Sequence, residues 1–172
     1  ITACRYGKKD IVKLLLDHSD SNIDLNATND IGWTGLMFAC FDEHKDIVQL
    51  LLDHSDRIDL NAKDNCGHTA LTHACENGRY NVVQLLLDNS DRNIDLNVAT
   101  NGGLTAFIWA CYKGHKNVVQ LFLDHSDQIK LNAKDSLGMT AFMRACGNGH
   151  TDVVQLLLDH SDKIELNVKD DK

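Results

Sequence analysis

The residue types closest to catalytic machinery form a four-residue motif, Asp-His-Ser-Asp, at residues 17–20, 53–56, 124–127 and 159–162. Acid, histidine and serine are the ingredients of a hydrolase triad, in which the histidine takes a proton from the serine hydroxyl. Consecutive residues at a helix end do not face one another, however, and an active site is not expected in four copies. We therefore predict that each histidine lies near the negative C-terminus of a helix and that each serine satisfies exposed carbonyls.

A second group of residues with ligand chemistry lies between positions 66 and 75. Cys66, His68, His73 and Cys75 are all types that bind zinc. His73 and Cys75 are two positions apart, so on a helix they point to nearly opposite sides, which excludes a site with all four ligands. A three-ligand site of Cys66, His68 and His73 stays open as an alternative. The main expectation is that the chain holds no metal and no cofactor.

Both motifs belong to a unit that is repeated along the chain. Five cysteines, each preceded by alanine, recur at steps of 36, 35, 36 and 35 residues, and an apolar triplet beginning with leucine recurs with them. The cysteines are Cys4, Cys40, Cys75, Cys111 and Cys146. A period of this size is typical of stacked-repeat proteins, in which each unit buries its apolar face against the next.

Each unit contains the signals of two short helices. In the third unit Leu71, Ala74 and Cys75 share one helix face, while His73, Glu76 and Asn77 share another, which predicts one packed and one free face. Threonines that precede the first helices are expected to act as N-caps: Thr34, Thr69, Thr105 and Thr140. A glycine two residues before each threonine predicts a tight turn at a β-hairpin finger.

The repeated unit resembles the ankyrin repeat, whose pattern is D-x-x-G-x-T-P-L-H-x-A-A-x-x-G-H-x-x-V-V-x-L-L-L. Residues 67–91 and 138–162 align with one another without gaps and carry this pattern. A longer Ser-Asp-x-Ile-Asp-Leu-Asn stretch follows the second helix and lengthens the unit beyond the usual 33 residues. The resemblance implies an all-α repeat solenoid: helix–turn–helix pairs linked by β-hairpin fingers in a right-angled, L-shaped stack with a concave binding face.

The resemblance covers residues 1–172 as a single solenoid of about five units. We place the units at 1–28 (partial), 29–63, 64–99, 100–134 and 135–169, with 170–172 starting a further unit. Because residue 1 lies inside a first helix, we expect the chain to be a segment of a longer array. In ankyrin proteins a histidine after glycine tends to bond backbone and lock a turn, and His44, His115 and His150 hold that position.

Composition narrows the class of protein and of partner. The chain is 24% charged and 43% hydrophobic, within the globular range, and no apolar run is long enough to span a membrane. A net charge of −8 argues against nucleic acid and anionic membranes as partners. Five of the six cysteines occupy a small-residue core position, so we expect free thiols, a reducing compartment and an intracellular protein, cytoplasmic or nuclear.

The positions that differ between units are expected to specify a partner, because the repeated residues serve the common fold. On the fingers and the free faces of the first helices these positions hold six of the ten aromatic residues. Such residues form binding hot spots. The predicted partner-binding residues are Tyr6, Trp33, Phe38, Phe41, His68, His73, Glu76, Trp109, Tyr112, Lys113, Met139 and Arg144.

The uneven distribution of these residues predicts two apolar patches separated by a polar strip in the third unit. We predict a monomeric, non-enzymatic interaction module that holds a protein or peptide on its concave face. The resemblance implies the same surface. Two readings compete with this one: a single aromatic such as Phe38 or Trp109 packs into the core instead, or the segment is a spacer or regulatory part of a larger enzyme, channel or host-directed effector.

Overall fold

The computed structural model of the chain describes residues 1–18 and 23–169. Ser19 and Asp20 of the first Asp-His-Ser-Asp motif, and the further unit expected at 170–172, lie outside these residues. Ten α-helices occur in the described residues, two per unit. The first helices are α1 Thr2–Arg5, α3 Gly35–Phe41, α5 Ala70–Glu76, α7 Ala106–Lys113 and α9 Ala141–Gly147. The second helices are α2 Lys9–Asp17, α4 Lys45–Leu52, α6 Tyr80–Asp88, α8 Lys116–Asp124 and α10 Thr151–Asp159.

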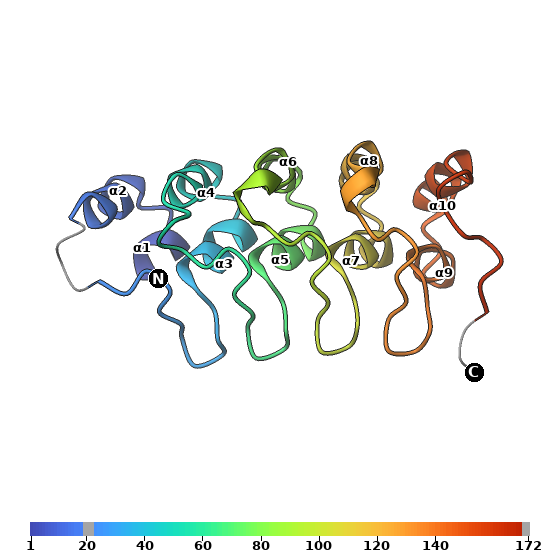
Figure 1. Ribbon diagram of the computed structural model, residues 1–172, viewed down its shortest axis with the longest axis horizontal. Coiled ribbons are helices and arrows are strands. Elements are labelled where there is room, and N and C mark those ends of the chain that lie inside the picture. The colour runs from blue at the N-terminus through green and yellow to red at the C-terminus, as the bar shows by residue number, and fades with distance from the viewer. Residues whose placement is uncertain (19–22, 170–172) are drawn as a thin grey trace.

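The helices form two stacked rows. Figure 1 shows the even-numbered helices in one row, the odd-numbered helices in a second row beside it, and the connecting loops projecting away from the odd-numbered row. Neighbouring helices of each row contact one another, and each first helix contacts its own second helix. The all-α repeat solenoid expected from the sequence is confirmed. None of the helices in the described segments is long and apolar enough to cross a membrane.

The start of each complete first helix is fixed by a threonine, as predicted. The hydroxyl oxygens of Thr34, Thr69 and Thr105 accept hydrogen bonds from the backbone N–H groups three residues later, over 3.2, 3.3 and 3.3 Å. Thr140 does the same over 3.4 Å. These contacts satisfy amides that would otherwise have no partner in the first turn.

The fingers are hairpin-shaped loops rather than β-hairpins. Within residues 1–18 and 23–169 there is no strand, and one isolated bridge joins Ala99 and Thr105. Each turn needs a glycine, for example Gly67 at a φ of 82°. Successive fingers are instead joined sideways, because Asn65 N–H donates to Ile31 O over 3.1 Å and Asn101 N–H donates to Cys66 O over 3.0 Å. These lateral bonds use the amides of residues inside the finger turns, which have no partner within their own finger.

Histidines at the N-cap of α4, α8 and α10 tie the second, fourth and fifth units to the unit before, and Arg79 does so for the third. The Nε2 atoms of His115 and His150 lie 3.0 and 2.8 Å from the carbonyl oxygens of Glu76 and Tyr112, at the end of the preceding first helix. His44 bonds the Arg5 carbonyl in the same way over 3.1 Å. The expected backbone-bonding role is confirmed, and the bond crosses between units.

The lengthened loops are joined by a ladder of asparagine side chains. Asn97 donates from Nδ2 to Gln128 O over 2.9 Å and accepts at Oδ1 from Lys130 N–H over 2.7 Å. Asn26, Asn61 and Asn132 make the same pair of contacts with the next loop. Each asparagine therefore uses both ends of its amide to hold two units together.

The repeated cysteines lie along the packed core. Cys4, Cys40, Cys75 and Cys111 are buried, whereas Cys146, on α9, is exposed. All are free thiols, as expected. Burial raises the pKa values of Cys40, Cys75 and Cys111, and neighbouring cysteines raise those of Cys40 and Cys75 further. The small-residue core position is thus filled by a row of protonated thiols.

Candidate functional site

The recurrent Asp-His-Ser-Asp motif is a helix end. In its described copies the histidine Nδ1 atoms of His54, His125 and His160 lie 2.8, 2.8 and 2.9 Å from the carbonyl oxygens four residues earlier. The histidine prediction is therefore confirmed. The serine prediction is wrong for Ser126, whose hydroxyl accepts from Lys163 Nζ over 2.9 Å. The ring nitrogen that a triad would need is already engaged with the helix.

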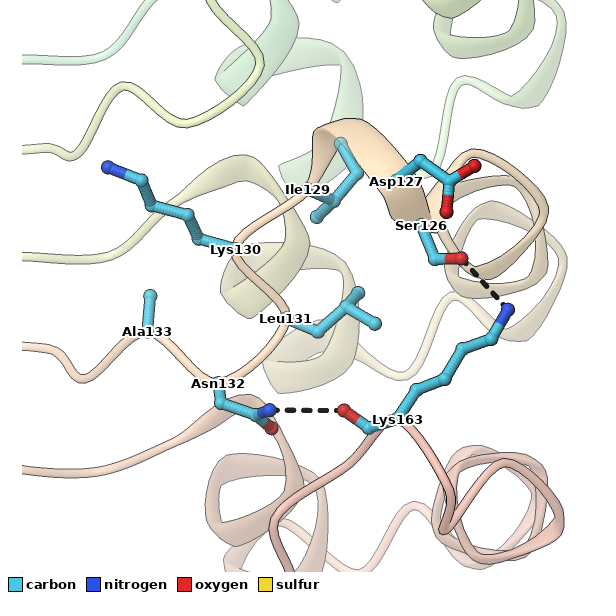
Figure 2. Close-up of a pocket in the computed structure, with 8 residues that line it drawn as sticks. All are labelled: Ser126, Asp127, Ile129, Lys130, Leu131, Asn132, Ala133 and Lys163. Carbon is cyan, nitrogen blue, oxygen red and sulfur yellow. Dashed lines mark hydrogen bonds between the residues drawn. The ribbon is translucent and has the colours of Figure 1, made fainter.

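An open pocket lies at the junction between the last two lengthened loops. Figure 2 shows it lined by residues that follow α8, together with Lys163 of the next unit. Its polar groups bond one another: Lys163 Nζ donates to Ser126 Oγ over 2.9 Å, and Asn132 Nδ2 donates to Lys163 O over 3.0 Å. The pocket is a seam between units, closed by one member of the asparagine ladder.

The predicted partner-binding residues gather on the face formed by the fingers and first helices, where seven rings make a continuous series that we call the ring row. Its members are Phe38, Trp33, Phe41, His73, His68, Trp109 and Tyr112. At one end the Trp33 ring lies 4.9 Å from Phe38 and 5.2 Å from Phe41. At the other end Trp109 and Tyr112 meet edge to face at 5.5 Å.

The two histidines of the third unit join the two ends of the ring row. The His73 ring lies 4.2 Å from Trp33 and stacks on the His68 ring at 5.0 Å. The His68 ring then lies 5.5 Å from Trp109. Two imidazole rings of the third unit therefore lie between the Trp33 group and the Trp109 group. The expectation of two apolar patches separated by a polar strip stays a prediction.

Two of the predicted binding residues are buried rather than solvent-facing. Phe38 is 8% exposed and His73 is 4% exposed. The finger residue Trp33 covers both rings, so the helix face that looks free in the sequence is partly closed by the chain that precedes it. Trp33, Phe41, Trp109 and Tyr112 are half-buried, and Tyr6 is 60% exposed. The solvent-accessible area of these aromatic rings therefore belongs mainly to Trp33, Phe41, Trp109 and Tyr112.

Charged groups border the ring row. The Lys113 ammonium lies 5.4 Å from the centre of the Trp109 ring and 3.2 Å from a Glu76 carboxylate oxygen. Arg5 lies over the Phe38 ring at 5.4 Å, and Arg144 over the Tyr112 ring at 5.8 Å. Positive charges above ring faces are favourable cation–π contacts. Met139 is half-buried on the last described finger, where its carbonyl accepts from Asp135 N–H over 3.0 Å.

Two finger acids that bond side chains of the predicted binding set were not predicted from the sequence. Asp64 Oδ2 lies 2.9 Å from His73 Nε2, and Asp135 Oδ2 accepts from Arg144 Nε over 2.6 Å. Each acid precedes its partner by nine residues. The sequence contains this pattern. The two units with a finger aspartate have a basic residue nine positions later, whereas the units with Asn29 and Thr100 have an aromatic residue there.

The buried Asp64–His73 pair holds an ionised acid and a neutral ring. Burial alone would raise the pKa of Asp64, but N–H donors from His68 and Cys66 hold it below its usual value. Burial lowers the pKa of His73, and nearby Asp64 opposes this only in part. The Nδ1 atom of His73 is buried without a partner, so a second ring proton would have no acceptor. The neutral ring therefore donates from Nε2.

The three-ligand zinc alternative needs a correction. Among the described residues, one group of three potential ligands has its donor atoms within 4.8 Å of one another, and it comprises Asp64, Cys66 and His68. His73 is not in that group, although its Nε2 atom lies 2.9 Å from Oδ2 of Asp64. Cys66 and His68 were identified from the sequence. The third residue is Asp64, which the finger turn brings close to them.

Comparison with known proteins identifies the repeat. A family model described as "Ankyrin repeats (3 copies)" matches residues 1–100 and, in a second match, residues 92–170. The two matches together extend over nearly all of the described chain. A comparison with curated protein sequences gave no match.

Proposed function

We propose a function from the fact that the chain belongs to the ankyrin-repeat family. The chain is a non-enzymatic module that binds a protein or peptide on the concave face formed by its fingers and first helices. Ankyrin repeats are generally protein–protein interaction modules. The observation that carries the proposal is the ring row, which places half-buried tryptophan, phenylalanine and tyrosine rings side by side on that face.

The ring row suits a partner because its rings are held in place before binding. Trp33 is packed between Phe38, Phe41 and His73, so it loses little side-chain freedom when a ligand covers it. Rigid aromatic residues that become fully desolvated supply much of the binding energy in protein interfaces. Trp109 and Tyr112 offer a second such anchor, with the Lys113 ammonium beside both rings.

Charged residues along the ring row would set the direction of the bound chain. Glu76 and Lys113 already pair across 3.2 Å at the border of two units, so a ligand must either keep that pair or replace both partners. Interface charges contribute more to orientation and to the exclusion of wrong partners than to affinity. The aromatic anchors and this pair together define what the module would select.

The experiment is selection of linear peptides from a displayed library, followed by titration calorimetry with single variants. Trp109→Ala and Tyr112→Ala should each weaken a selected peptide by about 2 kcal/mol, or about thirtyfold, if the rings are hot spots. Tyr80→Ala is the matched control, because Tyr80 is an exposed aromatic on α6, in the other helix row.

Three results would decide the matter. Loss of binding in Trp109→Ala and Tyr112→Ala, with Tyr80→Ala unchanged, supports the concave face. Equal binding by all three folded variants would place the ligand elsewhere and refute the proposed site. Failure to select any peptide or folded-domain ligand would favour the competing reading, in which the array acts as a spacer or regulatory segment of a larger protein.

A further inference from the structure

We propose that the finger of the third unit binds a zinc ion through Asp64, Cys66 and His68. Their donor atoms lie within 4.8 Å of one another. Nδ1 of His68 and Oδ1 of Asp64 are already 3.5 Å apart. Zinc bonds of about 2.0 to 2.3 Å place ligand atoms roughly 3 to 4 Å apart around a tetrahedral ion. The 3.5 Å separation of His68 and Asp64 lies in this range, and the 4.8 Å limit of the group lies roughly 1 Å above it.

The turn of the finger holds the three ligands on a rigid frame. Asp64 Oδ1 accepts hydrogen bonds from the N–H groups of Cys66 and His68 over 2.9 and 2.8 Å. The Asp64 carbonyl accepts from Gly67 N–H over 2.9 Å, and Asp64 N–H donates to the His68 carbonyl over 2.9 Å. These bonds close the loop around the carboxylate, so little freedom remains to be lost when an ion binds.

An acidic residue lies near each ring nitrogen of His68. Its Nδ1 atom faces Asp64 and is buried with no hydrogen-bond partner. Its Nε2 atom lies 4.0 Å from a carboxylate oxygen of Glu76. Histidines that bind metal through one nitrogen commonly donate the other N–H to a carboxylate, which fixes the tautomer and the ring orientation. Glu76 would serve as that carboxylate.

The combination of the three ligands is specific to the third unit, although Asp64 also closes its finger turn as Asn29 and Asp135 close theirs. The three equivalent positions read Asn-Ile-Trp in the second unit, Thr-Gly-Leu in the fourth and Asp-Leu-Met in the fifth. All of these fingers close by the same backbone bond. The additions of the third unit to the common finger are therefore Cys66 and His68, which place a thiol and an imidazole beside the carboxylate.

The chemistry of the ligands selects the ion. A thiolate and an imidazole suit zinc and disfavour magnesium and calcium, which prefer oxygen ligands alone. Cys66 is exposed, so an ion can enter from solvent. Three protein ligands leave the fourth tetrahedral position for water or for a side chain of a bound partner. The site stands independently of the proposed peptide-binding function.

The test titrates the purified 172-residue chain, stripped with chelator and kept reduced, with zinc and with cobalt. Zinc is expected to bind at one ion per chain by elemental analysis after dialysis. Cobalt is expected to give the charge-transfer absorption of a thiolate ligand. Cys66→Ser and His68→Gln should lose the stoichiometric ion and, for Cys66→Ser, the thiolate band. Cys146→Ser is the matched control, since Cys146 is the other exposed cysteine, and it should behave like the parent chain.

A fourth variant tests the carboxylate beside His68. Glu76→Gln leaves all three ligands in place and should weaken zinc by about tenfold or more. Circular dichroism before titration ensures that only folded variants are compared. The proposal is overturned if the parent chain shows no thiolate band, if Cys66→Ser retains it, or if the parent and Cys66→Ser retain the same zinc after dialysis.

Discussion

Nε2 of His73 donates a hydrogen bond to Oδ2 of Asp64 over 2.9 Å, and both side chains are buried. This contact joins a finger to the first helix of the same unit and holds one member of the ring row in place. The fifth unit repeats it with Asp135 and Arg144. A charged finger residue therefore accompanies a basic helix residue, and each partner removes the cost of burying the other.

The first prediction concerns this pair. His73→Phe should destabilise the chain by about 2 kcal/mol, because the buried Asp64 carboxylate loses its side-chain donor. The double variant Asp64→Asn with His73→Phe reproduces the pairing of Asn29 with Phe38 and should recover most of that loss. Chemical denaturation in the presence of chelator measures both. A double variant that is no more stable than His73→Phe would show that the pair is not coupled.

The second prediction is a loss of stability on acidification. Burial depresses the folded-state pKa of His73 below its ordinary value of 6.5, so the unfolded chain binds the proton first. The contribution is fully present above pH 6.5 and is lost as pH falls from there toward the folded-state pKa, with a limiting slope of about 1.4 kcal/mol per pH unit. Asp64, Glu76 and His68 are the titrating neighbours of this ring.

The measurement is the free energy of unfolding from pH 8 to roughly pH 5, with chelator present, for the parent chain and the Asp64→Asn, His73→Phe double variant. Subtracting one curve from the other cancels the contributions of the other histidines to the free energy of unfolding. The parent should lose stability faster than the double variant below pH 6.5. Parallel curves would contradict the depressed pKa of His73.

The third prediction concerns thiol reactivity. A thiol reagent at neutral pH should label Cys66 and Cys146 in the native, metal-free chain, because these two are exposed. Burial raises the pKa values of Cys4, Cys40, Cys75 and Cys111, so these thiols should stay protonated and unlabelled until denaturant is added. Mass spectrometry of labelled peptides identifies the sites. Rapid labelling of Cys75 in native protein would contradict the packing of the core.

The fourth prediction concerns Glu43, which has a φ of 61° where the other units have glycine. A left-handed conformation costs a non-glycine residue about 1 kcal/mol or more. Glu43→Gly should therefore raise the stability by about 0.5 to 1 kcal/mol, despite the loss of the contact between Glu43 and Asn81 Nδ2 at 3.2 Å.

Asn93→Gly is the control for Glu43→Gly. Asn93 has a φ of 65°, but asparagine tolerates this region, so its replacement should change stability little. Denaturation midpoints of the two variants would be compared with the parent chain. A destabilised Glu43→Gly would show that the side-chain contacts outweigh the relief of backbone strain.

The sequence predicted the features that each unit determines by itself. Thr69 caps its helix and Cys75 lies in the core, because a cap and a helical face depend on neighbours a few residues away. The helix-end histidines were predicted for the same reason, since His125 bonds a carboxyl-terminal carbonyl four residues earlier. The stacking of the units was inferred from the repeat period and from the resemblance to the ankyrin repeat.

The features that were missed depend on a finger folding over a helix. His73 was assigned to a free face because helical periodicity carries no information about Trp33, which comes from the preceding unit and covers the ring at 4.2 Å. Asp64 was overlooked because its partner is nine residues away, a spacing that belongs neither to a helix nor to a strand. The continuity of the ring row arises from the same contacts between units.

The finger-to-helix pairing also bears on how such an array changes over generations. Asp64 and His73 lie in one unit, as do Asp135 and Arg144. Duplication, deletion or exchange of a whole repeat in the gene therefore transfers acid and base together and leaves no charge stranded in the core. Recombination at repeat boundaries can change the charges on the face formed by the fingers and first helices one unit at a time. A point mutation of one partner, in contrast, produces a destabilised protein until the other partner also changes.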